Sequence, residues 1–315
     1  MSSPSVTTSA APAVRPKHHG WWWKLLIAGL VVWVITVIVT VVTQNSNLIP
    51  TIILLGSFLV PLVVVMFAAD RVRGNLTTTS LLLAFVVGGI FGVLGASLLE
   101  ADLPQSPLAF IGAGLAEETV KGLILLIVGW RVVPKDGYQG ALLGATVGAG
   151  FAAFESAGYA FNAVISQPGT LDLGSLVQTE ALRGVLTPVG HVLWTAILGA
   201  AIFAAARGAN HHYRWRWSIL VAWVAVVILH ALWDLMGTIG ALIAIGVTGT
   251  AGEIQNGFLS NAAAQQVSTL ATVFYIIGEV IITLAGIFIL RAFVKTPRAD
   301  AVPASAGSET PPGVR

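Results

Sequence analysis

The chain has 315 residues, of which 56% are hydrophobic and only 10% are charged, with a formal net charge of +2. Soluble domains carry roughly 25% charged residues, so this composition and a mean hydropathy of +0.86 exclude a soluble enzyme and predict a membrane protein. The absence of cysteine excludes disulfides, thiolate metal sites and a cysteine nucleophile. The basic residues follow the expected membrane topology and give no indication of nucleic-acid binding.

Apolar runs of about 20 residues predict helices that cross the bilayer. We expect an all-α polytopic bundle of about eight transmembrane helices, over 24–43, 48–69, 80–99, 108–130, 138–165, 188–206, 218–246 and 269–293. The transmembrane domain spans 21–295, and the helices that carry the chemistry lie at about 108–246. Residues 1–20, rich in Ser, Thr, Ala and Pro, and the Pro-rich residues 296–315 are predicted to be disordered tails.

The distribution of Lys and Arg predicts the orientation, because short cytoplasmic loops retain positive charge. With the N-terminus inside, every Lys and Arg falls in a cytoplasmic segment except Lys121 and Arg183. The expected outer loops carry mainly acidic residues. Both termini, and with them the two tails, are therefore expected in the cytoplasm.

The two longest connections are expected on the outer side, over 166–187 and 247–268. The first contains Glu180 and Arg183 at helical spacing, so it can hold a short helix, and the next helix begins at Pro188 or earlier. The second is polar and rich in small residues, which predicts a mobile loop. Either connection lies where it can gate the lateral entry of a substrate.

Three charged residues interrupt the apolar helix expected over 108–130, namely Glu117, Glu118 and Lys121. Each charge at a helix centre costs about 2.5 to 3.5 kcal/mol on insertion scales, and such residues usually face inward and serve a function. The structural alternative is a local ion pair, because Lys121 follows the two glutamates at spacings of four and three residues.

Further polar and aromatic residues lie at helical spacings in the helices that follow, namely Phe151, Glu155, Tyr159, His191, His230 and Asp234. Taken singly, each allows a structural role, such as a protonated carboxyl group or an interfacial histidine. Glu279 stands alone in the last helix, and we assign it no role.

Taken together, these charges are difficult to explain as structural. The five charged side chains of the three motif helices would cost on the order of 15 kcal/mol if left separately in lipid, which is comparable to the stability of a domain. Four carboxylates against one lysine must share protons, charge a histidine or bind a cation. Glu117, Glu155 and Asp234 each lie roughly 10 residues, or about 15 Å, from the outer ends of their helices. We therefore expect a polar chamber near the midplane, open toward the outer leaflet.

Several protease patterns are missing from the sequence. It contains no His-Glu-x-x-His zinc helix, only one aspartate inside a helix, and no clear histidine partner for Ser97. What remains is Glu-Glu-x-x-Lys at 117–121, Phe-x-x-x-Glu-x-x-x-Tyr at 151–159, the lone His191, and His-x-x-x-Asp at 230–234. In their order and apolar setting these motifs resemble the PrsW family of intramembrane proteases, distant relatives of the CAAX prenyl endopeptidases and the bacteriocin-immunity membrane proteases.

The resemblance covers about 108–245 by motif. It implies an endopeptidase that hydrolyses peptide bonds of membrane-anchored, single-span proteins, such as anti-sigma factors, in the plasma membrane of a bacterium. It also implies that Glu117, Glu118, His191 and His230 carry the catalysis. The supporting residues are then Lys121, Phe151, Glu155, Tyr159 and Asp234.

Three further alternatives stay open at this point. We favour catalysis without a cofactor, with Glu117 polarising a water molecule and Glu118 moving the proton, but a metal-dependent version is the first alternative. It would use zinc or another divalent cation and nitrogen and oxygen ligands from Glu117, Glu155, His191, His230 and Asp234. A proton- or ion-coupled transporter also uses carboxylates and histidines inside helices, although no inverted repeat is evident. A non-enzymatic membrane scaffold is the third.

Overall fold

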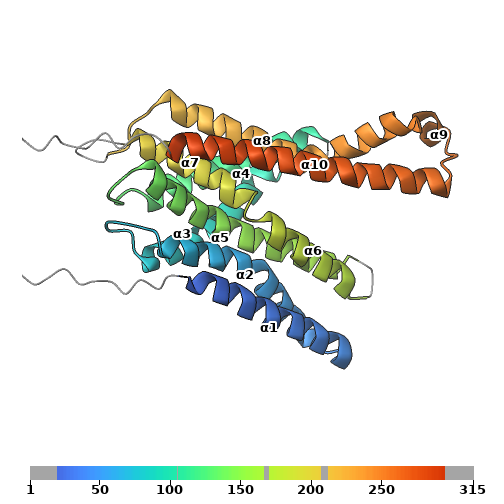
Figure 1. Ribbon diagram of the computed structural model, residues 1–315, viewed down its shortest axis with the longest axis horizontal. Helices are drawn as coiled ribbons and strands as arrows, with labels where there is room; N and C mark the ends of the chain where they lie inside the picture. The colour runs from blue at the N-terminus through green and yellow to red at the C-terminus, as the bar shows by residue number, and fades with distance from the viewer. Residues whose placement is uncertain (1–19, 105, 167–169, 207–211, 295–315) are drawn as a thin grey trace, which may run out of the picture.

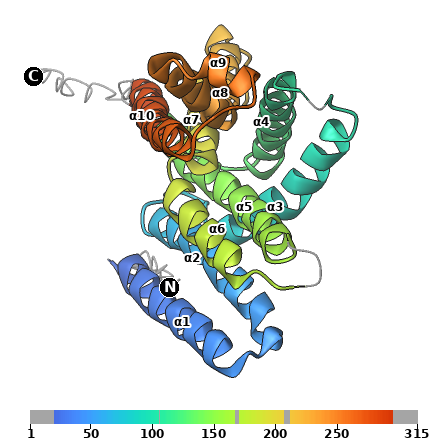
Figure 2. The same ribbon diagram turned by 90° about the vertical axis from the view of Figure 1, so that its right-hand side faces the viewer.

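The computed structural model describes residues 20–104, 106–166, 170–206 and 212–294. Within these ranges the chain is a bundle of helices without strands (Figures 1 and 2). In chain order the elements are α1 (Trp21–Thr43), the short 3-10 helix η1 (Ser46–Leu48), α2 (Ile49–Ala69), α3 (Thr78–Glu100), α4 (Leu108–Val128), α5 (Gly137–Val164), α6 (Leu173–Leu186), α7 (His191–Ala205), α8 (Trp217–Thr248), α9 (Ala251–Gln255) and α10 (Asn261–Val294). The predicted tails lie outside the described residues, apart from Gly20.

By length and composition, seven stretches of the described chain can cross a membrane, one of them the α6–α7 segment Leu173–Ala205. Helix α4 is not one of the seven, because three charged residues lie in its middle. Its 21 residues nevertheless equal the length of α2, and with α4 the number of passes matches the eight expected. The prediction of an all-α polytopic membrane protein is confirmed, whereas the side on which the termini lie stays a prediction.

Helix α5 lies in the middle of the bundle (Figure 2), and small residues let α7 approach it closely. A Cβ atom added to Gly140 would lie 2.1 Å from the carbonyl oxygen of Gly199, and one added to Gly148 would lie 2.4 Å from that of His191. Backbone atoms occupy the space that side chains would need. The four-residue spacing of Gly140, Gly144 and Gly148 thus forms the contact face that such spacing favours in membranes.

The outer connections contain more helix than expected. The first contains α6, and the turn after it passes through Pro188, so that α7 begins at His191. In the second, the predicted mobile loop 247–268 is wrong for most of its length, because α9 lies within it and α10 begins at Asn261. The run of Ala and Gln that opens α10 is polar enough to leave the bilayer but favours helix strongly.

The glycine contacts between α5 and α7 predict a position-specific effect on stability. We expect Gly140→Ala to lower the free energy of unfolding by about 1–3 kcal/mol through overpacking. The matched control is Gly158→Ala in the same helix, where an added Cβ meets no atom within 4 Å, so stability should be unchanged or slightly higher. Thermal unfolding in detergent measures both variants, and equal stabilities would contradict the close approach.

Candidate active site

The charged motif of α4 forms a buried ion cluster. Lys121 Nζ lies 3.1 Å from Glu117 Oε2 and 2.6 Å from Glu118 Oε1, and the lysine side chain is fully buried. The intrahelical ion pair that the sequence allowed is therefore present. The ammonium also has a partner on another helix, because His191 Nδ1 lies 3.0 Å from Nζ. The cluster thus joins α4 to α7 and is not a purely local pair.

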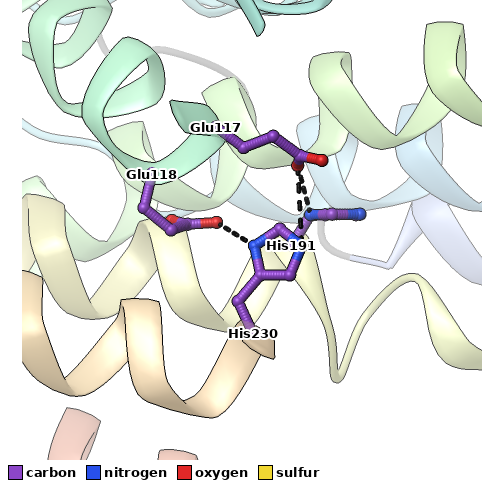
Figure 3. Close-up of side chains that lie close together, drawn as sticks. All are labelled: Glu117, Glu118, His191 and His230. Carbon is purple, nitrogen blue, oxygen red and sulfur yellow. Dashed lines mark hydrogen bonds and ion pairs between the residues drawn. The ribbon is translucent and has the colours of Figure 1, made fainter. Parts of the chain in front are cut away.

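The two histidines face the glutamates (Figure 3). His191 is the first residue of α7, and its Nδ1 lies 3.7 Å from Glu117 Oε2. His230, in α8, places Nδ1 2.9 Å from Glu118 Oε1 and Nε2 3.7 Å from Glu117 Oε2. One ligand atom from each of these four residues lies within 4.8 Å of the other three. Three helices therefore contribute to a single centre, and the four residues expected to be catalytic lie together in it.

Glycines in the neighbouring helices permit this convergence. A Cβ added to Gly114 of α4 would lie 3.2 Å from the carbonyl oxygen of Val227 and 3.4 Å from the Cβ of His230. Any larger residue there would push α8 away from the glutamates one turn further along α4. Gly148 serves α7 in the same way, because the added Cβ would meet the carbonyl of His191 itself.

A carboxylate lies behind each histidine. Glu155 Oε2 is 3.0 Å from His191 Nε2, and Asp234 Oδ2 is 3.4 Å from His230 Nε2. Since the Lys121 ammonium can only donate, Nδ1 of His191 accepts, which leaves the ring hydrogen on Nε2 to be donated to Glu155. Glu155 and Asp234, named above as candidate metal ligands, lie beside the imidazoles but outside the group of four close ligand atoms, whereas Glu118 lies within it.

Aromatic rings enclose the centre. The Lys121 ammonium lies 4.1 Å from the ring centroid of Phe151, which in turn contacts His191 at 5.1 Å between ring centroids. The fully buried Trp194 stacks on His230, with centroids 4.6 Å apart and planes inclined by 28°. Sequence reasoning identified Phe151 but missed Trp194. Its position three residues after His191, on the same helix face, was the available signal.

The centre forms one wall of an open cavity of about 490 Å³. Glu117 lines this chamber whereas Glu118 does not. Tyr159, half exposed, lies on the chamber wall as part of the predicted α5 motif. The lining also includes residues that the sequence did not single out for the site, namely Glu100, Arg183 and Trp233. Buried Glu279 of α10 does not line the chamber and stays without a role.

Removal of the buried ammonium should destabilise the fold. Lys121→Met leaves Glu117 and Glu118 without their counter-ion, and breaking a buried pair in this way costs about 3–5 kcal/mol. The double variant Glu118→Gln/Lys121→Met should lose less, because one carboxylate charge is removed together with the lysine. Lys24→Met, an exposed position in α1, is the control. If thermal unfolding shows Lys121→Met to be as stable as the wild type, the ammonium does not balance the glutamates.

Comparison with known families agrees with the geometry. The model of the PrsW family intramembrane metalloproteases matches residues 74–277. This range contains α3 to α9, the beginning of α10, and all the residues of the cluster. No curated protein and no solved structure matches the chain. Because the family match spans more than half of the 315 residues, the chain belongs to the PrsW family of intramembrane metalloproteases.

Proposed function

We propose that this protease hydrolyses peptide bonds of membrane-anchored proteins at the centre formed by Glu117, Glu118, His191 and His230. The observation that supports the proposal most strongly is the convergence of these four residues, from three helices, beside an open chamber. Glu117 lies roughly 10 residues into α4, or about 15 Å from the helix end. A scissile bond that reaches it would be cut inside the bilayer.

The two glutamates have different surroundings and therefore different roles. Glu117 lines the chamber and can reach a water molecule next to a substrate carbonyl. It takes the proton from the attacking water and delivers it to the leaving amine. Glu118 is fully buried and receives hydrogen bonds from Lys121 and His230. It holds these two groups in position and does not touch the substrate.

The histidines and the lysine stabilise negative charge. Lys121 brings a fixed positive charge to the carboxylates without contact with bulk water. His230 lines the chamber, and its Nε2, the nitrogen on the side of Glu117 and Asp234, can donate to the oxygen on which charge develops while Nδ1 stays with Glu118. Groups that are already oriented need no rearrangement when the charge forms, which is the usual origin of large electrostatic contributions to catalysis.

A divalent cation fits the donor set. Two imidazoles and two carboxylates place their ligand atoms close enough together to bind one ion. In addition, Glu118 Oε2 is buried without a hydrogen-bond partner among the described residues. A bound cation would take the place of the Lys121 ammonium, which contacts three of the four residues. With the family's description as a metalloprotease, this favours the metal-dependent version over the cofactor-free one preferred from sequence. When bound, the ion would supply Lewis-acid polarisation of the scissile carbonyl.

The substrates that we propose are single-span membrane proteins, of which anti-sigma factors are the class implied by the sequence resemblance. The bilayer is the second partner, since both substrate and enzyme lie in it, and we place the protein in the plasma membrane of a bacterium. Family membership favours proteolysis over ion-coupled transport or a scaffold role. Proton flux into liposomes without any cleavage would support the transporter instead.

Glutamate substitutions test the catalytic assignment. We expect Glu117→Gln and Glu118→Gln, and likewise His230→Ala, to lower the cleavage rate of purified protein by at least about 100-fold, the lower range for loss of a general acid or base. Glu253→Gln, on the exposed helix α9, should cleave at the wild-type rate. Cleavage is followed on gels with a panel of single-span proteins in liposomes. Unchanged rates in both Glu117→Gln and Glu118→Gln would refute the proposal.

Metal analysis tests the cofactor. We expect the purified wild type to contain close to one divalent cation per chain, and His191→Gln and His230→Ala to contain much less. Removal with a strong chelator should abolish cleavage, and zinc or another divalent ion should restore it. Full activity in protein shown to be free of metal would overturn the metal-dependent version, while leaving the assignment of the glutamates intact.

A further inference from the structure

Helix α6 lies between α2 and α5 (Figure 2), shares an apolar cluster with both through the buried Leu176, and presents one charged side chain to each. Glu180 is buried against α2, where Ser57 Oγ donates to its Oε1 at 2.8 Å. Arg183, one turn further along, contacts α5. Because residues three apart are neighbours on a helix face, the two polar contacts add to this apolar packing in fixing the rotation of α6. Ser57 lies outside residues 74–277, the range that the family model matches, so the hydrogen bond between Ser57 and Glu180 is not part of that match.

Arg183 contacts three side chains on one face of α5. Its guanidinium forms an ion pair with Glu155 and donates from Nε to Ser156 Oγ at 2.7 Å. It also lies 4.3 Å from the ring centroid of Tyr159. A guanidinium carries its donors in a rigid, planar fork, so these contacts leave it little freedom although the side chain borders the open chamber.

The same carboxylate oxygen connects Arg183 to the catalytic centre. Glu155 Oε2 accepts from the guanidinium and also from His191 Nε2, at 3.0 Å. His191 in turn presents Nδ1 to Lys121 and Glu117. Without Arg183, Glu155 would lose its charged partner and could rotate into the chamber, and the imidazole would lose the acceptor that determines which nitrogen bears the hydrogen.

We propose that Arg183 is a positioning residue for proteolysis, which acts through Glu155 to hold His191 in its ring orientation and tautomer. This inference rests on the proposed function. The rival role is direct binding of a substrate carboxylate or carbonyl by the guanidinium, and it makes different kinetic predictions.

Kinetics of the full-length protein in liposomes separate these roles. We expect Arg183→Gln and Glu155→Gln each to lower kcat by about 10–100-fold, as is usual for residues that orient a ligand from behind, with little change in KM. The double variant should lose no more than the more impaired single variant, because both act on His191 by one route. Arg183→Lys should recover part of the rate, and Arg291→Gln, at an exposed position of α10, should leave it unchanged. Multiplicative losses, or a change confined to KM, would overturn the proposal.

A spectroscopic measurement does not depend on cleavage. In protein with ¹⁵N-labelled histidine, the signals of His191, assigned by their loss in His191→Gln, should report hydrogen on Nε2 in the wild type and a mixture of tautomers in Arg183→Gln. If Arg183→Gln shows the mixture of tautomers but the wild type cleaves no candidate, the proposed function fails while the action of Arg183 on His191 stands. If Arg183→Gln cleaves normally with an unchanged tautomer, the positioning role fails and the function stands.

Discussion

The buried ammonium of Lys121 is the interaction on which the rest of the structure depends. It lies between Glu117, Glu118 and His191 and is fully removed from solvent. Two adjacent carboxylates in a low-dielectric environment repel each other and lose their hydration, so they need a positive charge and hydrogen bonds in fixed positions. The helix spacing of the motif places that charge on the same helix, before any contact with α7 or α8 is made.

The bundle is built so that the polar groups meet and the apolar ones face lipid. Glycines on α4 and α5 let α8 and α7 come close enough for the histidines to reach the glutamates. Behind His191, Glu155 accepts from Nε2, so that Nδ1 faces the centre, and Asp234 lies 3.4 Å from Nε2 of His230. This arrangement, with a carboxylate behind each imidazole, suits both oxyanion stabilisation and the binding of a cation. Helix α6, through Arg183, extends the same network to the wall of the chamber.

The membrane-crossing helices could be predicted from the sequence, because the thickness of the bilayer sets their minimum length. Hydropathy located the membrane passes, including α4, because about 20 apolar residues are needed to cross the hydrocarbon layer. Hydropathy did not give the bounds of α6, and it missed α9 and the start of α10 at Asn261. These segments contain more polar residues than the predicted membrane passes, so hydropathy alone does not distinguish a helix there from a loop.

For the site, the sequence by itself determined which residues carry charge into the membrane and the contacts within each helix. The pairing of Lys121 with both glutamates follows directly from spacings of three and four residues. Only the tertiary structure decided that Glu118, and not Glu155 or Asp234, completes the group of close ligand atoms, and that Arg183 contacts Glu155. The reason is physical: spacing along one helix fixes neighbours within a turn, whereas the depth and rotation of one helix against another depend on how their surfaces pack.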